Sequence, residues 1–151
     1  MFDTSKAAAR PGAPAGRKVI AIEKEQDIAW AAREARAMAE DLGFSPVKVI
    51  QVSVSVMELA TNLFVHALPG GRLCLDEIRE QDQVGIEVIA ADAGPGIDDI
   101  DLAMQDRYST AGSMGCGLPA VQRLMDEFEI ISQAGGGNGC GTTVTARKWR
   151  R

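Results

Sequence analysis

Three polar side chains recur at helical spacing in a segment that is otherwise mostly apolar. Glu58, Asn62 and His66 occupy positions i, i+4 and i+8, which places them on one face of a helix. A solvated polar face is the ordinary interpretation of such a pattern. Asparagine, however, lowers helix propensity, and an amide one turn after a carboxylate suits divalent-cation chemistry. Asn62 could offer its carbonyl oxygen to Mg²⁺, and Glu58 could accept a proton.

A second candidate is Asp92, which stands where a largely apolar run meets a glycine turn. Residues 84–91 are mostly Val, Ile and Ala, and Gly94 and Gly96 follow the aspartate. A carboxylate in this place either caps the turn or accepts a hydrogen bond from a ligand that carries an N–H donor. Both interpretations stay open from these residues alone.

Glycine supplies 16 of the 151 residues, and most of the excess falls in three clusters. None of them matches the P-loop or the dinucleotide-binding pattern, which excludes both of those nucleotide-binding motifs. The cluster at 135–141 is expected to be a hairpin connection. Gly112, Gly115 and Gly117 precede a predicted helix, where free backbone N–H groups and the helix dipole favour an anion.

Composition and charge narrow the class of protein. The chain is 46% hydrophobic and 25% charged, as soluble globular domains are, and its formal net charge is −5, which argues against a nucleic-acid partner. It has no continuous apolar run of membrane-spanning length and no apolar segment typical of a signal peptide, so we expect no membrane association and a cytoplasmic location. The three cysteines form no CxxC pair, which argues against a disulfide framework or a zinc cage.

The elements that must position these residues follow from periodicity and capping signals. Residues 1–16 read as a disordered lead-in, and 17–151 as a single domain. A strand is predicted at 18–23, and a helix from 25 that Gly43 ends. Ser45 caps a second helix that runs from Pro46 to about residue 67. The buried stripe of this helix comprises Val52, Val56, Leu59 and Leu63.

The remainder of the chain predicts four more strands and one further substantial helix. The strands are expected at 72–79, 84–92, 128–132 and 142–148. The first two form a hairpin through the polar turn 80–83. A short helix at 100–105 and a loop at 106–116 precede a helix at 117–127, and the basic residues 147–151 read as a solvated strand end. The sum is an α+β fold, a two-layer sandwich with a mixed, mostly antiparallel sheet and helices on one face.

The order of these motifs resembles that of the GHKL (Bergerat-fold) ATPases. Glu58-x-x-x-Asn62, Asp92-x-Gly94-x-Gly96, a glycine-rich lid and Gly141-Thr142 follow one another as the boxes of that superfamily do. Longer strings narrow the resemblance to the RsbT class of serine/threonine-protein kinases, over about residues 18–149. These strings are MELATN at 57–62, YST at 108–110, GLPAVQRLMDEF at 117–128 and GTTVTARKW at 141–149.

The resemblance implies ATP or ADP as the nucleotide, with Mg²⁺ bridging the phosphates. It implies that Glu58 is the general base, that Asn62 is the metal ligand, and that Asp92 accepts a hydrogen bond from the adenine amino group. Gly94 and Gly96 would let the backbone approach the base, beside an apolar wall at Ile97. Thr142 would reach the adenine through water. The lid and the start of the next helix would hold the phosphates through Gly112, Ser113, Met114, Gly115, Cys116, Gly117 and Leu118.

The same resemblance implies protein partners. A STAS-domain protein of the stressosome type would be the substrate, and a PP2C-type phosphatase would be activated by the free kinase. An anti-sigma factor kinase of the RsbW or SpoIIAB type, which also binds a sigma factor, is an alternative. A non-catalytic module that binds ATP is another. The lid departs from the regular Gly-Leu-Gly-Leu-Gly run of the family.

Overall fold

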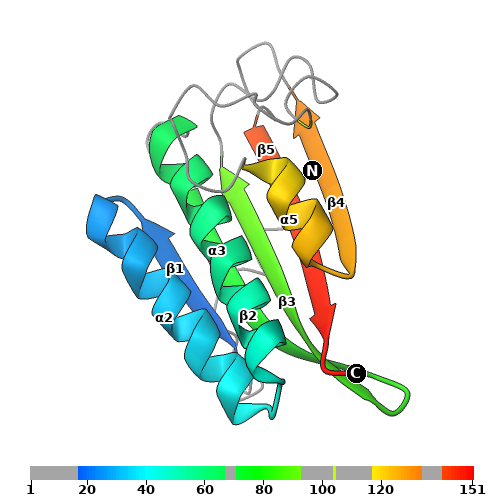
Figure 1. Ribbon diagram of the computed structural model, residues 1–151. Coiled ribbons are helices and arrows are strands. Elements are labelled where there is room, and N and C mark those ends of the chain that lie inside the picture. Colours follow the sequence, from blue (N-terminus) through cyan, green and yellow to red (C-terminus); the bar gives the residue numbers. More distant parts are fainter. Residues whose placement is uncertain (1–16, 67–70, 93–103, 105–116, 134–140) are drawn as a thin grey trace.

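The structure consists of a sheet with a helical layer on one of its faces. The computed structural model describes residues 17–66, 71–92, 104, 117–133 and 141–151. Within these ranges, five strands form one sheet in the order β1-β2-β3-β5-β4, and each neighbouring pair is antiparallel. The helices cover the same face of this sheet (Figure 1). The predicted α+β two-layer sandwich is confirmed.

The first strand and helix form where the sequence predicts them. β1 (Lys18–Ile22) lies at one edge of the sheet, and α2 (Glu25–Asp41) follows after a short turn. The Asp27 carboxylate accepts hydrogen bonds from the backbone N–H groups of Glu23 and Lys24, at 3.0 and 2.9 Å. Asp27, the third residue of the helix, therefore caps the backbone N–H groups of the two residues that precede the helix, as the acidic residue of a capping box does.

A glycine turn and a serine cap separate α2 from α3 (Pro46–His66). Gly43 has a φ of +82°, and the backbone of this turn makes the two hydrogen bonds of a Schellman motif to the last turn of α2. The Ser45 hydroxyl accepts a hydrogen bond from the backbone N–H of Lys48 at 3.3 Å. Both predicted helix boundaries are confirmed.

α3 is the central helix of the layer, and its buried stripe is the predicted one. The stripe residues Val52, Val56, Leu59 and Leu63 are each at most 3% exposed. Over Pro46–Val65, α3 also has the length and apolar composition of a membrane-spanning helix, and 44% of that window is buried inside the protein. Its apolar character is explained by packing, because the stripe belongs to the hydrophobic core between helices and sheet.

The strands β2 (Gly71–Glu80) and β3 (Gln83–Asp92) form the predicted hairpin with a tighter turn than expected. Pairing extends to Glu80 and Gln83, which leaves two residues in the turn. The first of them, Gln81, adopts a φ of +53°. The favoured two-residue hairpin turns have a positive φ at their first position, which accounts for this conformation in a residue that is not glycine.

The helix α5 (Leu118–Leu124) is shorter than the predicted helix at 117–127. The backbone N–H of Asp126 donates to the carbonyl of Arg147 at 2.9 Å, so the chain has already joined the sheet at this point. β4 (Glu127–Gln133) begins at the next residue and forms the second edge. Pairing with a distant strand therefore overrides the helical pattern of the last three residues.

The C-terminal strand β5 (Gly141–Trp149) lies between β3 and β4, and its end is not the solvated basic segment that we predicted. Lys148 is 6% exposed, and its ammonium donates to the Leu124 carbonyl at 2.8 Å. The indole N–H of Trp149 donates to Glu127 at 2.6 Å. The prediction of a solvated end is wrong for Lys148 and Trp149, because these side chains hydrogen-bond to α5 and β4, whereas Arg151 is exposed.

Several predicted segments lie outside the described residues. They are the lead-in at 1–16, the short helix at 100–105 except Met104, the loop at 106–116 and the connection at 135–140. Met104 is partly buried and packs against the hydrophobic core.

Close packing of α3 on β2 yields a prediction about stability. A Cβ atom at Gly71 would lie 2.5 Å from the Leu63 δ-methyl and 2.7 Å from the Ala91 carbonyl oxygen. We expect Gly71→Ala to lower the free energy of unfolding by about 1–3 kcal/mol, because side chain and backbone must both move. Urea unfolding followed by circular dichroism measures this loss.

A second substitution tests the steric origin of the loss. Leu63→Val removes the δ-methyl that lies nearest to the added Cβ. The double variant Gly71→Ala/Leu63→Val should therefore be less destabilised than the sum of the single variants. An unchanged unfolding midpoint for Gly71→Ala alone would show that α3 and β2 are not in close contact here.

Candidate nucleotide-binding site

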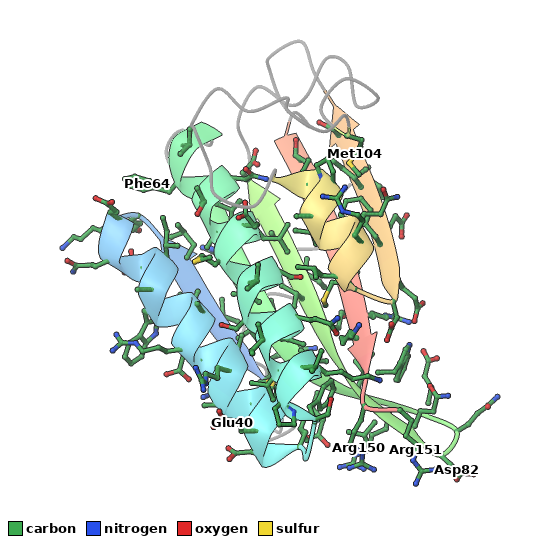
Figure 2. The ribbon with its side chains drawn as sticks, in the orientation of Figure 1. Glu40, Phe64, Asp82, Met104, Arg150 and Arg151 are labelled. Carbon is green, nitrogen blue, oxygen red and sulfur yellow. The ribbon has the colours of Figure 1, made fainter. Side chains whose placement is uncertain are left out.

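The segments that carry the predicted site residues, where the structure describes them, meet at one end of the two-layer structure. The last turns of α3, the end of β3 and the beginnings of β5 and α5 meet there (Figure 1). Figure 2 shows Phe64 at this end of the molecule, whereas Asp82, Arg150 and Arg151 lie at the opposite end. Segments that are far apart in the sequence are thus brought together, as a binding site built from these motifs requires.

Glu58 and Asn62 lie on the flank of α3 that is turned away from α2. On the α2 side, the Ser53 hydroxyl donates to the carbonyl of Ala32 at 3.4 Å. Glu58 follows five residues later, a rotation of about 140° around the helix axis. α3 lies between α2 and α5 (Figure 1), so this rotation directs Glu58, and Asn62 one turn later, toward the side of α5.

Burial distinguishes Glu58 from an ordinary surface glutamate. Its side chain is 3% exposed, and Asn62 is half-buried. The interpretation of a solvated polar face therefore does not hold for Glu58. Taking a carboxylate out of water costs several kcal/mol before its interactions offset the loss. The burial of Glu58 is compatible with the role that the resemblance implies, and that role stays a prediction.

Ser55 is a buried polar residue that our motif analysis missed. It lies one turn before Glu58 on the same flank of α3 and is fully buried. Among the described residues, its hydroxyl oxygen makes no hydrogen bond. The sequence feature that could have identified Ser55 is its position inside the valine-rich run at 52–56, where the buried stripe predicts apolar side chains.

Strand pairing brings together two of the residues predicted to bind the nucleotide, Asp92 and Thr142. Asp92 is the last residue of β3, and Thr142 is the second of β5. The backbone N–H of Thr142 donates to Oδ1 of Asp92 in a long hydrogen bond of 3.4 Å. The carboxylate is thus oriented by the neighbouring strand. Sequence reasoning missed Ser132 of β4, whose Oγ lies 2.8 Å from Oγ1 of Thr142.

The start of α5 depends on a glycine. Gly117 has φ +62° and ψ −132°, a conformation that side chains with a Cβ rarely adopt. A Cβ there would meet no atom within 4 Å, so the backbone conformation and not space requires glycine. Leu118 is 7% exposed and packs in the core, so only its backbone is placed to contact a ligand.

The remaining predicted contacts lie outside the described residues. They are Gly94, Gly96, Ile97, Gly112, Ser113, Met114, Gly115 and Cys116. Their roles stay predictions from the resemblance.

Comparison with known proteins agrees with the motifs. Residues 21–148 match the family model described as a histidine kinase-like ATPase domain. The chain is 39% identical over 132 residues to the serine/threonine-protein kinase RsbT of Bacillus subtilis, which covers 87% of this chain and 96% of that protein. It is 30% identical over 121 residues to an anti-sigma F factor of Caldanaerobacter subterraneus, covering 77% and 83% of the two chains.

A solved structure supports the fold. The mycobacterial sensor histidine kinase MprB superposes with a TM-score of 0.54 at 16% identity, covering 89% of this chain and 98% of the other. The family match spans most of the chain, and the identity to RsbT extends over nearly the whole of both proteins. The chain therefore belongs to the histidine kinase-like ATPase domain family, in the branch that contains the serine/threonine-protein kinase RsbT and the anti-sigma F factors.

Proposed function

We propose that this protein is a cytoplasmic, ATP- and Mg²⁺-dependent serine/threonine-protein kinase of the RsbT class. Its substrate is a STAS-domain protein of the stressosome type, and its second partner is a PP2C-type phosphatase that the free kinase activates. The identity to RsbT, 39% against 30% for an anti-sigma F factor, supports the choice of class. The observation that carries the proposal is the buried Glu58 on α3, the helix whose last turns lie at the same end of the fold as the Asp92–Thr142 pair.

Glu58 is the residue that acts on the protein substrate. In this proposal it accepts the proton of the serine or threonine hydroxyl as that oxygen attacks the γ-phosphate. A buried position suits this role, because exclusion of water limits transfer of the phosphoryl group to water instead. The polar flank of α3 faces α5, where the lid segment enters the helix, so acceptor and nucleotide would meet between these two helices.

Asp92 and Thr142 form the base-binding part of the site. Asp92 accepts a hydrogen bond from the exocyclic amino group of adenine, and Thr142 contributes its hydroxyl, directly or through one water. Gly94, Gly96 and Ile97 would complete this part, and the backbone of 112–118 would hold the phosphates. Phosphoryl transfer depends mainly on positioning and charge stabilisation, so this set of residues is chemically sufficient.

Asn62 fits the role of a metal ligand. Its half-buried amide lies one helical turn from Glu58, with an oxygen of the hard type that Mg²⁺ prefers. Within the described residues there is no cluster of three His, Cys, Asp or Glu side chains that could hold a metal alone. A single protein ligand is compatible with a Mg²⁺ ion that substrate phosphates and waters hold. When bound, the ion would neutralise phosphate charge.

The direct test is incubation with labelled ATP and the STAS-domain protein encoded in the same operon. The proposal expects label on a serine or threonine of the STAS protein, dependent on Mg²⁺ and on both proteins. ATP binding without transfer to any STAS partner would favour a non-catalytic ATP-binding module. Stable, nucleotide-dependent binding of a sigma factor would favour the alternative of an anti-sigma factor kinase of the RsbW or SpoIIAB type, which the similarity to anti-sigma F factors keeps as second candidate.

The role of Asp92 is tested by the isosteric change Asp92→Asn. The amide can present a donor to the amino group of the base, and such a mispaired buried contact costs about 1–3 kcal/mol. We therefore expect weaker binding of ADP in the presence of Mg²⁺, measured by isothermal titration calorimetry. Asp82→Asn, at the opposite end of the molecule, is the matched control. Equal affinities of the parent and Asp92→Asn would remove Asp92 from the site.

A further inference from the structure

Ser55 is a fully buried serine on the flank of α3 that carries Glu58. It is 0% exposed, and within the described part of the chain its hydroxyl oxygen has no hydrogen-bond partner. The buried side chains of α5, which packs against this flank, include Leu118 and Val121 and are apolar. Burial of a hydroxyl without a partner lowers stability, and alanine would occupy nearly the same space without that cost. The Ser55 hydroxyl therefore needs an explanation other than the stability of the fold.

The helix itself offers this hydroxyl two acceptors. A serine or threonine inside a helix often donates to the carbonyl four residues earlier, as Thr61 does to Met57 at 2.7 Å. Ser55 does not use the corresponding carbonyl, which belongs to Gln51. The second acceptor is the carboxylate of Glu58, which follows three residues later on the same flank.

Helix geometry brings the Glu58 side chain over Ser55. Residues at i and i+3 are neighbours on the surface of a helix, with about 5–6 Å between their Cβ atoms. A long helical side chain also points back toward the N-terminus, onto the turn that lies three to four residues before it. A carboxylate has about four acceptor positions. Glu58 can therefore accept a hydrogen bond from Ser55 in addition to another interaction.

From this arrangement we propose that Ser55 is a positioning residue of the kinase site, acting through Glu58. When ATP and the protein substrate are bound, the Ser55 hydroxyl turns to another staggered rotamer and donates to the Glu58 carboxylate. This hydrogen bond holds the carboxylate toward the acceptor hydroxyl, and an oriented base transfers the proton more effectively than a mobile one. The inference rests on the proposed function, because it presumes that Glu58 is the base. In this role Ser55 contacts neither the nucleotide nor the protein substrate.

The test removes the Ser55 hydroxyl and measures phosphoryl transfer and stability on the same preparation. Ser55→Ala should lower kcat for phosphorylation of the STAS protein about 10- to 100-fold, the range of a hydrogen bond to a charged group. KM for the STAS protein and the affinity for ATP should stay within about twofold of the parent, because only the reacting geometry changes. The urea midpoint should equal or exceed that of the parent, because a buried hydroxyl without a partner is removed. Ser55→Cys keeps the volume but is a weak donor, and it should lose kcat as Ser55→Ala does.

Two controls separate positioning of the base from general damage to the helix. Ser53→Ala removes a partly buried hydroxyl of the same helix, one that donates to the Ala32 carbonyl on the α2 side, and should leave kcat unchanged. In a Glu58→Gln background, adding Ser55→Ala should have no further effect on kcat, since the base that Ser55 positions is absent. Losses that multiply in this cycle, or a urea midpoint of Ser55→Ala well below that of the parent, would overturn the inference.

The remaining outcomes distinguish failure of the inference from failure of the proposed function. A parent that phosphorylates the STAS protein, with a Ser55→Ala variant that has the same kcat, overturns the role of Ser55 alone. A parent that transfers no phosphate, or a Glu58→Gln variant that transfers it at the parent's rate, overturns the proposed role of Glu58 and with it the inference.

Discussion

Glu58→Gln should reduce phosphorylation of the STAS substrate about 10²- to 10³-fold while ATP affinity stays within a fewfold of the parent. The change keeps the size, helix propensity and hydrogen-bonding capacity of the side chain and removes only the base. A positioned general base contributes about 10²–10⁴-fold, and a loose transition state for phosphoryl transfer places the effect in the lower half of that range. Phosphorylated substrate is measured by mass spectrometry, and ATP affinity on the same preparation.

A burial-matched control accompanies this experiment. Glu87 is also buried, at 7% exposed, but lies on β3 and pairs with Arg147 at 2.8 Å. Glu87→Gln should lower stability without lowering the rate of transfer per folded molecule. If Glu58→Gln retains phosphorylation within a fewfold of the parent, Glu58 is not the base.

The second large effect is expected for Asn62→Ala. Removal of a metal ligand should reduce the Mg²⁺ dependence of nucleotide binding and reduce phosphorylation. The loss should be at least the roughly 10–100-fold that changes in the outer shell of a metal site produce. Calorimetric titration with ADP at several Mg²⁺ concentrations gives the metal dependence, and the labelled-ATP assay gives the rate.

Two further variants isolate the ligand role. Asn62→Asp retains an oxygen that can bind Mg²⁺ and should keep the metal dependence of nucleotide binding. Gln51→Ala removes another half-buried amide from α3, three turns before Asn62, and should leave that dependence unchanged. If ADP binding to Asn62→Ala depends on Mg²⁺ as strongly as in the parent, Asn62 does not bind the metal.

Local signals predicted most of the secondary structure. The stripe of α3 repeats at helical spacing, Gly43 and Ser45 separate α2 from α3, and β3 is strongly apolar. Each of these signals lies within a few residues of the element that it controls. Capping, helical periodicity and turn chemistry are short-range effects, which is why they are readable from one chain. The Glu58–Asn62 pair belongs to the same class, because helix geometry alone places both residues on one face.

Long-range contacts account for what the sequence pattern did not predict. α5 ends early because Asp126 pairs with Arg147, and Lys148 near the C-terminal end is buried because its ammonium reaches the Leu124 carbonyl. In both cases the partner lies some twenty residues away in the chain. No propensity of the segment itself contains that information, since strand pairing and burial override local preference.

The same distinction between local signals and long-range contacts applies to the candidate site. The motifs identify Glu58, Asn62, Asp92 and Thr142 from residue type and order. That Glu58 is buried depends on how the layers pack, and that Ser132 joins Thr142 and Asp92 depends on the register of β4, β5 and β3. A shift of one residue in that register would turn the Ser132 side chain to the other face of the sheet. Register is decided by the packing of Ala90, Val144 and Ile130 against the helices, a property of the assembled layers and not of any one segment.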